Sequence, residues 1–300
     1  MGFPVQGSGF RVGNLEPRTL NGGSSVLLEN RVAVITGSAS GMGKAMALKF
    51  AGEGCNIVVN DIQIDKAQEV VDTVKSCGRD AIAVKADVSN SEDIKSLISQ
   101  AVGKFGKIDI LVTNAGAAGG ADLEHSDEDE WDKVLALNLK GAFMLCKSAV
   151  PHMKKQRYGK IIMLSSMGAV RPSISVLAYH AAKSGIIGLM KNLAFELAPF
   201  GIYVNCIVPG PIETPFWDPL SAGMSEEKKQ AFFAELGRKE VPLGRMGQPE
   251  EIAGPALFFA SELSSYVTGQ VLCVAGGQPG ITQEMTFISA PESQDFGKKT

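Results

Sequence analysis

Short apolar runs rich in β-branched residues alternate with helix-length segments along most of this chain. The runs predicted as strands are residues 31–36, 56–60, 81–85, 108–113, 160–164, 204–208 and 271–274. Segments between them, such as 65–76, 92–105 and 128–151, are amphipathic. Near-continuous apolar strands separated by helices indicate a parallel sheet that is covered on both faces. We therefore expect an α/β fold of three layers, a doubly wound parallel sheet of about seven strands.

The alternating region contains no internal repeat and no linker rich in Pro, Gly or Ser, so we predict a single domain over residues 29–280. Residues 1–28 carry several glycines and lack the apolar run of a signal peptide, and we expect a flexible arm there. Residues 281–300 lose the alternation and become polar, which predicts a tail.

Charge and cysteine content exclude several classes of function. The net charge is −3, which gives no electrostatic footprint for nucleic acid. The five cysteines are scattered and form no C-x-x-C pair, so neither a disulfide framework nor a metal site is predicted. No stretch approaches the roughly 20 consecutive apolar residues of a membrane-spanning helix. We expect a cytoplasmic protein that binds neither nucleic acid nor membrane.

A glycine-rich turn joins the first predicted strand to the helix that follows it. Gly37, Gly41 and Gly43 stand there, with Ser40 and Met42 between them. Glycine allows a tight turn and lets the backbone approach a pyrophosphate, whose charge then lies at the helix N-terminus. The spacing departs from the G-x-G-x-x-G dinucleotide fingerprint, but its place between strand and helix favours a nucleotide site.

Asp61 ends the second predicted strand, where an acidic side chain accepts hydrogen bonds from the adenosine ribose hydroxyls. The same carboxylate would repel the 2′-phosphate of NADP. Neither Ser40 nor Ile62, the residue after Asp61, supplies a compensating cation. These residues predict NAD as the cofactor. The alternative is that Asp61 only caps a turn, as Asp often does.

Tyr179 and Lys183 are four residues apart, so on a helix they share one face and can meet the same ligand. The apolar residues Ile186, Met190 and Leu193 continue that face, which argues against an exposed, solvated pair. A nearby ammonium and the positive charge of oxidised nicotinamide both favour the phenolate. Tyr179 is therefore the candidate general acid and base of a hydride-transfer enzyme.

Ser166 lies just after the predicted strand 160–164, at the edge of the sheet where ligands bind in such folds. Its hydroxyl is suited to hold a carbonyl or alcohol oxygen, and Ser165 is its rival. His180 follows Tyr179, but neighbours on a helix point about 100° apart, which disfavours a role as second acid. His125 and His152 have no partners that indicate a metal.

These motifs resemble those of the short-chain dehydrogenase/reductase family in its short, single-domain form, over residues 29–280 or so. Thr36 to Gly43 match T-G-x-x-x-G-x-G, and Tyr179 and Lys183 match Y-x-x-x-K with the family's spacing from Ser166. The resemblance implies a Rossmann-type sheet. Thr113 stands where the family's N-N-A-G begins with Asn, and we expect it to hydrogen-bond the backbone in that residue's place.

The resemblance assigns further residues. It implies that Asn138 has a structural and proton-relay role, and that Ser166, Tyr179 and Lys183 complete the catalytic set. It places the cofactor against Gly37, Ser40, Gly41, Met42, Gly43, Asp61, Ile62, Asp87, Val88, Asn114, Ala115, Gly116, Tyr179, Lys183, Pro209, Gly210, Ile212 and Thr214.

The segment 211–245 corresponds to a helical lid in the family, whose closure would exclude water from the hydride path. Phe216 and Trp217 at its entrance, with Val176 and Leu177, predict an apolar substrate face that Ser166 and Tyr179 complete.

These features predict an NAD-dependent enzyme that interconverts a secondary alcohol and a ketone, with a cyclic or aliphatic alcohol or a 3-hydroxyacyl thioester as substrate. One alternative is a biosynthetic 3-oxoacyl-(carrier protein) reductase, in which Lys154, Lys155 and Arg157 would contact an acidic carrier. Another is a non-catalytic nucleotide-binding scaffold subunit. The resemblance also implies a homotetramer, or a homodimer, built on the helices predicted near residues 127–151 and 179–198.

Overall fold

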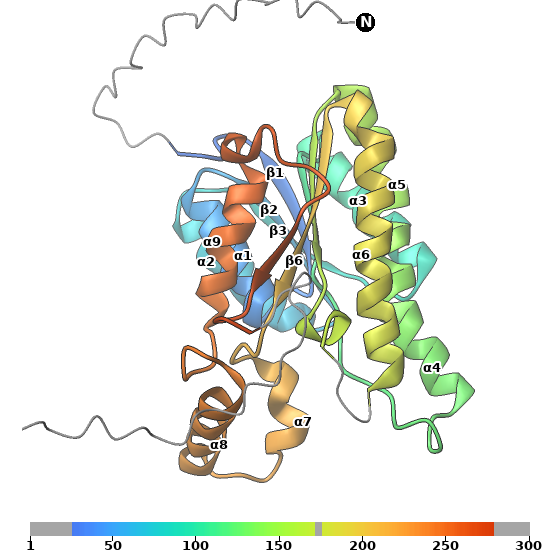
Figure 1. Cartoon of the computed structure of the whole chain (residues 1–300). Coiled ribbons are helices and arrows are strands. Elements are labelled where there is room, and N and C mark those ends of the chain that lie inside the picture. Colours follow the sequence, from blue (N-terminus) through green and yellow to red (C-terminus); the bar gives the residue numbers. More distant parts are fainter. Residues whose placement is uncertain (1–25, 172–175, 279–300) are drawn as a thin grey trace, which may run out of the picture.

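A sheet of seven parallel strands lies at the centre of the computed structural model, which describes residues 26–171 and 176–278 (Figure 1). The strand order is β3-β2-β1-β4-β5-β6-β7. The strands are β1 (Val32–Thr36), β2 (Asn56–Asp61), β3 (Ala81–Lys85), β4 (Ile110–Thr113), β5 (Gly159–Leu164), β6 (Ile202–Pro209) and β7 (Val271–Val274). This arrangement confirms the predicted doubly wound parallel sheet.

The direction of the chain across the sheet reverses between β1 and β4. The first three strands are added outward from β1, and the chain then crosses to β4 on the other side of β1. Because all strands are parallel, their carboxyl ends meet at one edge. The crevice at such a reversal is where ligands bind in open α/β sheets.

Two layers of helices cover the sheet (Figure 1). One face carries α1 (Gly41–Gly52), α2 (Ile64–Ser76) and α9 (Pro249–Ala260), whose apolar side chains form a core that includes Phe50, Val70 and Ile252. The other carries α3 (Ser91–Phe105), α5 (Gly141–Gln156) and α6 (Leu177–Leu197), with Leu97 and Met190 in its core. Burial on both faces explains why the strands are apolar at consecutive positions.

The helix predicted over 128–151 is in fact three elements. It consists of α4 (Glu128–Leu135), a π-helical turn η1 (Ala136–Lys140) and α5. The N–H of Gly141 donates to the carbonyl of Ala136, five residues earlier, which defines the wider turn. This turn places Asn138 in the interior, where it is 2% exposed.

By length and composition alone, the continuous helical stretch Glu128–Gln156 could cross a membrane. It is the one such helix among the residues that the structure describes. The expectation above concerned an uninterrupted apolar run, and this stretch carries charged residues along its length. Leu145, Cys146, Ala149 and Met153 of this stretch pack in the core against the sheet, as in the core helix of a globular domain.

The segment 211–245, which we call the lid segment, projects beyond the carboxyl edge of the sheet (Figure 1). It contains η4 (Pro215–Trp217), α7 (Asp218–Ser221) and α8 (Glu226–Glu240). Lys229 and Asp218 form an ion pair of 2.9 Å between the two helices. A β-bridge between Ile212 and Gly247 joins the start of the segment to the residues just after its end.

The short 3-10 turns are η2 (Met167–Ala169), η3 (Ala198–Phe200) and η5 (Glu262–Ser264). At the start of the described chain, Leu28 is buried in the core and its N–H bonds the carbonyl of Glu53 at 2.8 Å. The packed part therefore includes residues assigned above to the arm. The rest of the predicted arm (1–25) and the predicted tail (281–300) lie outside the described residues, and the domain limits stay a prediction.

Candidate active site

The glycine-rich turn leads from β1 into α1 with almost no free space. Gly37 has a φ of +61°, a conformation that side chains rarely adopt. A Cβ built on Gly43 would run into the carbonyl oxygen of Gly37 and would lie 2.8 Å from the Cα of Ser38. Because glycine has no side chain, the backbone of the turn packs closely against the first turn of α1. The N–H groups of that first turn have no partner within the helix and are available to a ligand.

Asp61 closes the same turn from β2. One carboxylate oxygen accepts the N–H of Ala39 at 3.1 Å, and the other accepts the N–H of Gln63 at 3.0 Å. The turn-capping alternative is therefore present in the structure. It does not exclude ligand binding, because Asp61 also lines the cavity described next, with Ile62, 61% exposed, beside it.

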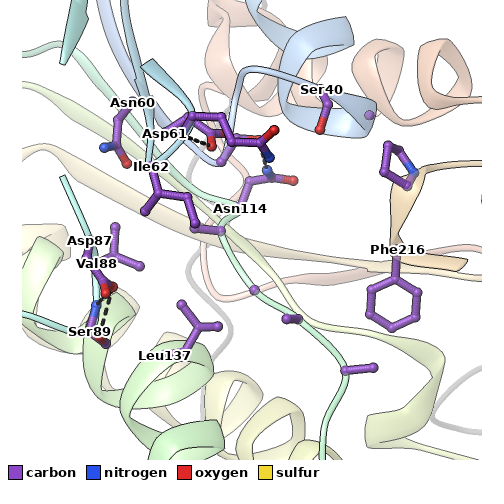
Figure 2. Close-up of a pocket in the computed structure, with 18 of the residues that line it drawn as sticks. Ser40, Asn60, Asp61, Ile62, Asp87, Val88, Ser89, Asn114, Leu137 and Phe216 are labelled. Atoms are coloured by element: carbon purple, nitrogen blue, oxygen red, sulfur yellow. Dashed lines mark hydrogen bonds between the residues drawn. The ribbon is translucent and has the colours of Figure 1, made fainter. Parts of the chain in front are cut away.

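A cavity of about 670 Å³ lies at the carboxyl edge of the sheet, at the reversal between β1 and β4 (Figure 2). Figure 2 shows Asp87, Val88 and Leu137 at one end and Phe216 at the other, with Asn114 between them. Of the predicted cofactor residues, its lining includes Gly37, Ser40, Gly41, Met42, Asp61, Ile62, Asp87, Val88, Asn114, Ala115, Gly116 and Thr214. Sequence reasoning missed Asn60, Gln63, Lys133 and Leu137.

Gly43, Asn138 and Lys183 line neither this cavity nor the second one described below. Gly43 acts through the tightness of the turn. The other two lie directly behind the cavity wall at Gly116. A Cβ built on Gly116 would lie 2.5 Å from Oδ1 of Asn138 and 3.2 Å from Nζ of Lys183.

The floor of the cavity is braced by Thr36 and Asn114. The Thr36 hydroxyl accepts the N–H groups of Asn114 and Ala115, both at 3.1 Å. The Asn114 amide donates to the carbonyls of Thr36 and Gly37, at 2.9 and 3.0 Å. Its Oδ1 finds no hydrogen-bond partner among the described residues.

The expectation for Thr113 is wrong. Its hydroxyl is buried and has no hydrogen-bond partner among the residues that the structure describes. The backbone bracing expected of it comes instead from Thr36, whose hydroxyl also donates to the carbonyl of Val112 at 3.3 Å.

Ser166 follows β5 directly and caps η2, with its Oγ accepting the N–H of Gly168 at 3.1 Å. Its hydroxyl is also hydrogen-bonded to the phenol of Tyr179, on the first turn of α6. The rival Ser165 instead donates to the carbonyl of Lys183 at 2.7 Å. The structure thus places Ser166, and not Ser165, against the tyrosine.

Burial raises the pKa of Tyr179, and the hydrogen bond with Ser166 lowers it. The protein's own groups therefore do not produce the net lowering expected from the neighbouring ammonium. Lys183 is buried, and its Nζ lies 5.5 Å from the centre of the Tyr179 ring. The Nζ donates to the carbonyl of Leu164 at 3.1 Å. Burial lowers the pKa of Lys183 to about 8, so the ammonium form still predominates at neutral pH.

Asn138 is fixed by the π-helical turn. Its amide nitrogen donates to the carbonyls of Val134 and Ala117, both at 3.1 Å. Its Oδ1 has no hydrogen-bond partner among the described residues and faces the same point behind Gly116 as the Lys183 ammonium. An acceptor placed in this way can hold a water molecule or a proton donor.

A second cavity, of about 540 Å³, adjoins the first and shares Met42, Ala118, Thr214 and Phe216 with it. Its lining contains the predicted residues Ser166, Val176, Tyr179, Pro209, Gly210, Ile212 and Trp217. Leu177 is not part of this lining, which corrects its assignment to the substrate face. Sequence reasoning missed Met167, Arg171, Leu220, Leu236, Glu240 and Gln278.

Aromatic side chains cover the tyrosine on the side of the lid segment. The rings of Phe216 and Tyr179 are 5.9 Å apart, and Trp217 packs edge-on against Phe216. The indole N–H of Trp217 donates to the carbonyl of Ile212 at 2.8 Å, which holds η4 in place. His180, disfavoured above, also lines the second cavity, and burial lowers its pKa.

Within the described residues, no group of three or more His, Cys, Asp or Glu side chains is placed to hold a metal ion. The cations suggested for carrier contact are partly engaged. Lys154 pairs with Glu196 at 3.8 Å, and Arg157 donates to the carbonyl of Pro199 at 3.0 Å.

Comparison with known proteins agrees with this geometry. A family model described as enoyl-(acyl carrier protein) reductase matches residues 37–278. The chain is 41% identical over 251 residues to the (2S)-[(R)-hydroxy(phenyl)methyl]succinyl-CoA dehydrogenase subunit BbsD of Thauera aromatica, covering 84% of this chain and 97% of the relative. It is 40% identical over 250 residues to the 3-oxoacyl-[acyl-carrier-protein] reductase FabG of Thermotoga maritima, covering 83% and 98%.

Solved structures show the same fold. Levodione reductase superposes with a TM-score of 0.78 at 30% identity, over 83% of this chain and 98% of its own. A 7α-hydroxysteroid dehydrogenase complexed with NADH and 7-oxo glycochenodeoxycholic acid gives 0.77 at 35% identity, over 85% and 96%.

Proposed function

The chain belongs to the short-chain dehydrogenase/reductase family of oxidoreductases, and from that premise we propose that it interconverts a secondary alcohol and a ketone with NAD as the cofactor. The observation that carries the proposal is that the two cavities meet at Phe216, whose ring lies 5.9 Å from that of Tyr179 in the second cavity. One cavity suits an elongated nucleotide, and the other receives the Ser166 hydroxyl and the Tyr179 phenol.

The residues of the first cavity fit a dinucleotide. The turn that a Gly43 side chain would fill lets a diphosphate approach the N-terminus of α1, and Asp61 offers carboxylate oxygens to ribose hydroxyls. A nicotinamide bound there would supply the hydride acceptor for the alcohol carbon and the hydride donor for the ketone.

The protein's own groups move the proton. Ser166 holds the substrate oxygen, and the Tyr179 phenolate takes the hydroxyl proton during oxidation and returns it during reduction. The buried Lys183 ammonium favours the phenolate. By family resemblance, the unpaired Oδ1 of Asn138 behind Gly116 continues the path along which this proton reaches solvent.

The NAD preference rests on Asp61. Its two backbone hydrogen bonds fix the carboxylate at the cavity wall, where it would repel a 2′-phosphate. Lys133 also lines this cavity, but it comes from α4 and not from β2, where Asp61 lies.

Replacing Asp61 by Ser should shift the preference toward NADP. A hydrogen bond to a charged group is worth about 1.5–3 kcal/mol, so the ratio of kcat/KM for NAD over NADP should fall by roughly 10- to 100-fold. Initial rates with both cofactors measure this ratio. Asp87→Asn is the matched control: by family resemblance Asp87 contacts the adenine, which both cofactors share, so its change should affect both alike. An unchanged ratio in Asp61→Ser would contradict the assignment.

Replacing Ser166 by Ala should move the pH profile of alcohol oxidation upward. The hydrogen bond with Ser166 lowers the pKa of Tyr179, so its removal raises that pKa, and the phenolate then forms only at higher pH. The pH dependence of kcat/KM measures the midpoint. Ser165→Ala removes a hydroxyl bonded to Lys183 and should leave the midpoint in place. A downward or absent shift in Ser166→Ala would count against the tyrosine as base.

An initial-rate panel tests the function as a whole. We would measure NAD and NADP with cyclic alcohols, aliphatic alcohols, steroids and 3-hydroxyacyl thioesters. Strong preference for NADPH and 3-oxoacyl thioesters would favour the biosynthetic reductase, a candidate supported by the similarity to FabG of Thermotoga maritima. Tight NAD binding without turnover of any compound would favour a scaffold subunit.

We further propose a homotetramer, or a homodimer, in the cytoplasm. The large apolar side chains of Phe143 on α5 and Phe195 on α6 are 43% and 88% exposed, and both long helices cover the same face of the sheet (Figure 1). Exposed apolar surface of this kind supports a subunit contact there.

A further inference from the structure

The second cavity is lined mainly by apolar side chains, but one wall is polar. There Arg171, Glu240 and Gln278 meet from three separate parts of the chain: the loop after η2, the end of α8, and the segment after β7. Arg171 and Glu240 form an ion pair of 2.7 Å. The side-chain nitrogen of Gln278 donates to the backbone carbonyl of Glu240 at 2.8 Å.

Gln278 is held in one orientation, because only its nitrogen can donate to the Glu240 carbonyl. This contact directs Oε1 toward Gly210, where a built Cβ would lie 3.1 Å from it. The residue is 7% exposed, and Oε1 has no hydrogen-bond partner among the described residues. A buried acceptor without a partner costs free energy, which a ligand with a donor would recover.

We propose that Gln278 is a specificity-determining residue whose Oε1 accepts a hydrogen bond from a second polar group of the substrate. This inference rests on the proposed alcohol and ketone chemistry and names the substrate class. The substrate is an apolar secondary alcohol or ketone that carries, away from the reacting carbon, an uncharged donor, either a hydroxyl or an amide N–H.

The charges on the polar wall favour a neutral group. Arg171 and Glu240 neutralise each other. Among the described residues that line this cavity, no other Lys, Arg, Asp or Glu occurs. A substrate carboxylate would have to displace Glu240, and an ammonium would have to displace Arg171. A hydroxyl or amide requires neither exchange.

Access to Oε1 depends on α8. Oε1 of Gln278 is covered in the present arrangement. The amide nitrogen of Gln278 is hydrogen-bonded to Glu240, the last residue of α8. The N–H of Leu243, just beyond, bonds the carbonyl of Gly276. A small movement of the end of α8 would therefore shift both sides of the amide together and admit the donor.

The test compares matched substrates. We would measure kcat/KM with NAD for cyclohexanediols and hydroxylated steroids against their mono-O-methyl ethers, which keep the oxygen and lose the donor. Acetamidocyclohexanols against acetoxycyclohexanols form the amide arm. The variants are Gln278→Met, which removes the acceptor at similar length, and Gln278→Glu, which keeps an acceptor oxygen.

We expect the wild type to prefer the donor compound by about tenfold or more in at least one arm, since a site built around a hydrogen bond rejects analogues that lack it. Gln278→Met should bring that ratio close to one, and Gln278→Glu should retain it. The Kd for NAD should not change in either variant. The arm with the preference separates hydroxyl from amide substrates.

Three results would overturn the inference. The first is equal rates for the donor compound and its ether in the wild type. The second is an equal loss of rate for both compounds in Gln278→Met, which would show that Gln278 only holds Glu240 in place. The third is weaker NAD binding with an unchanged ratio, which would place Oε1 against the cofactor. Calorimetric binding of the same pairs to the NAD-saturated protein separates this failure from that of the proposed function. Donor-selective binding without turnover would keep the role of Gln278 and reject the alcohol dehydrogenase.

Discussion

Replacing Tyr179 by Phe should nearly abolish NADH formation from any alcohol that the protein oxidises. The variant keeps the ring that packs against Phe216 and loses only the hydroxyl that bonds Ser166. General acid–base catalysis contributes roughly 10²–10⁴-fold, and the loss should be at least that large. The absorbance of NADH measures the rate, and the assay must resolve a loss of roughly 10²–10⁴-fold.

The Kd for NAD should stay close to that of the wild type, because Tyr179 lines the second cavity and is not part of the lining of the first. His180→Phe is a useful comparison. Its ring also lines the second cavity, yet we assign it no proton transfer, so it should retain turnover. Full activity in Tyr179→Phe, or a loss of equal size in His180→Phe, would refute the assignment of the base.

Replacing Gly43 by Ala should weaken NAD binding by roughly 10- to 100-fold, because overpacking typically costs about 1–3 kcal/mol and each 1.4 kcal/mol is tenfold in affinity. The added methyl group meets the Gly37 carbonyl and lies 2.7 Å from the Asn114 amide nitrogen. Both are backbone or fixed by hydrogen bonds, so the turn itself must move. Calorimetric titration with NAD measures the Kd.

Gly52→Ala is the matched control for this variant. Gly52 ends the same helix α1, and a Cβ there would meet nothing within 4 Å. Thermal unfolding of both variants shows how much of the Gly43→Ala effect is global. If Gly43→Ala bound NAD as tightly as the wild type, the glycine-rich turn would not be the diphosphate site.

The strand pattern could be predicted from sequence because parallel strands buried on both faces are apolar throughout. The bounds of β3 and β7 match the predicted 81–85 and 271–274, while β4 begins at Ile110, two residues later than predicted. Asp109 explains this difference. Asp109 is 3% exposed and forms ion pairs with Arg31 and Lys107. The start of the predicted strand 108–113 therefore contains a buried, paired carboxylate.

The catalytic residues could also be predicted, since they depend on spacing within one helix and on the end of one strand. The choice of Ser166 over Ser165 needed the family spacing, and the structure gives the reason in the bond from Ser165 to the Lys183 carbonyl. The effect of burial on the pKa of Tyr179 could not be predicted, because sequence names the neighbouring charge but does not give the degree of burial.

The polar wall of the second cavity had no signal in the sequence. Arg171, Glu240 and Gln278 are far apart along the chain and belong to no motif. They meet because the lid segment returns to the sheet beside β7, a tertiary contact that periodicity does not encode. Likewise, the helix over 128–151 had a regular apolar pattern, which gave no sign of the π-helical turn within it.

That turn makes chain length a constraint of its own. A π turn holds one residue more than an α turn, so deleting any one residue of Ala136–Lys140 would restore a regular helix. The helices on either side would keep their register, but the side chains of the turn itself would take up different positions. Asn138 and Leu139, which packs against Gly185, would lose their partners together. Library designs and alignments of this chain should therefore allow substitutions across Ala136–Lys140 but no gaps.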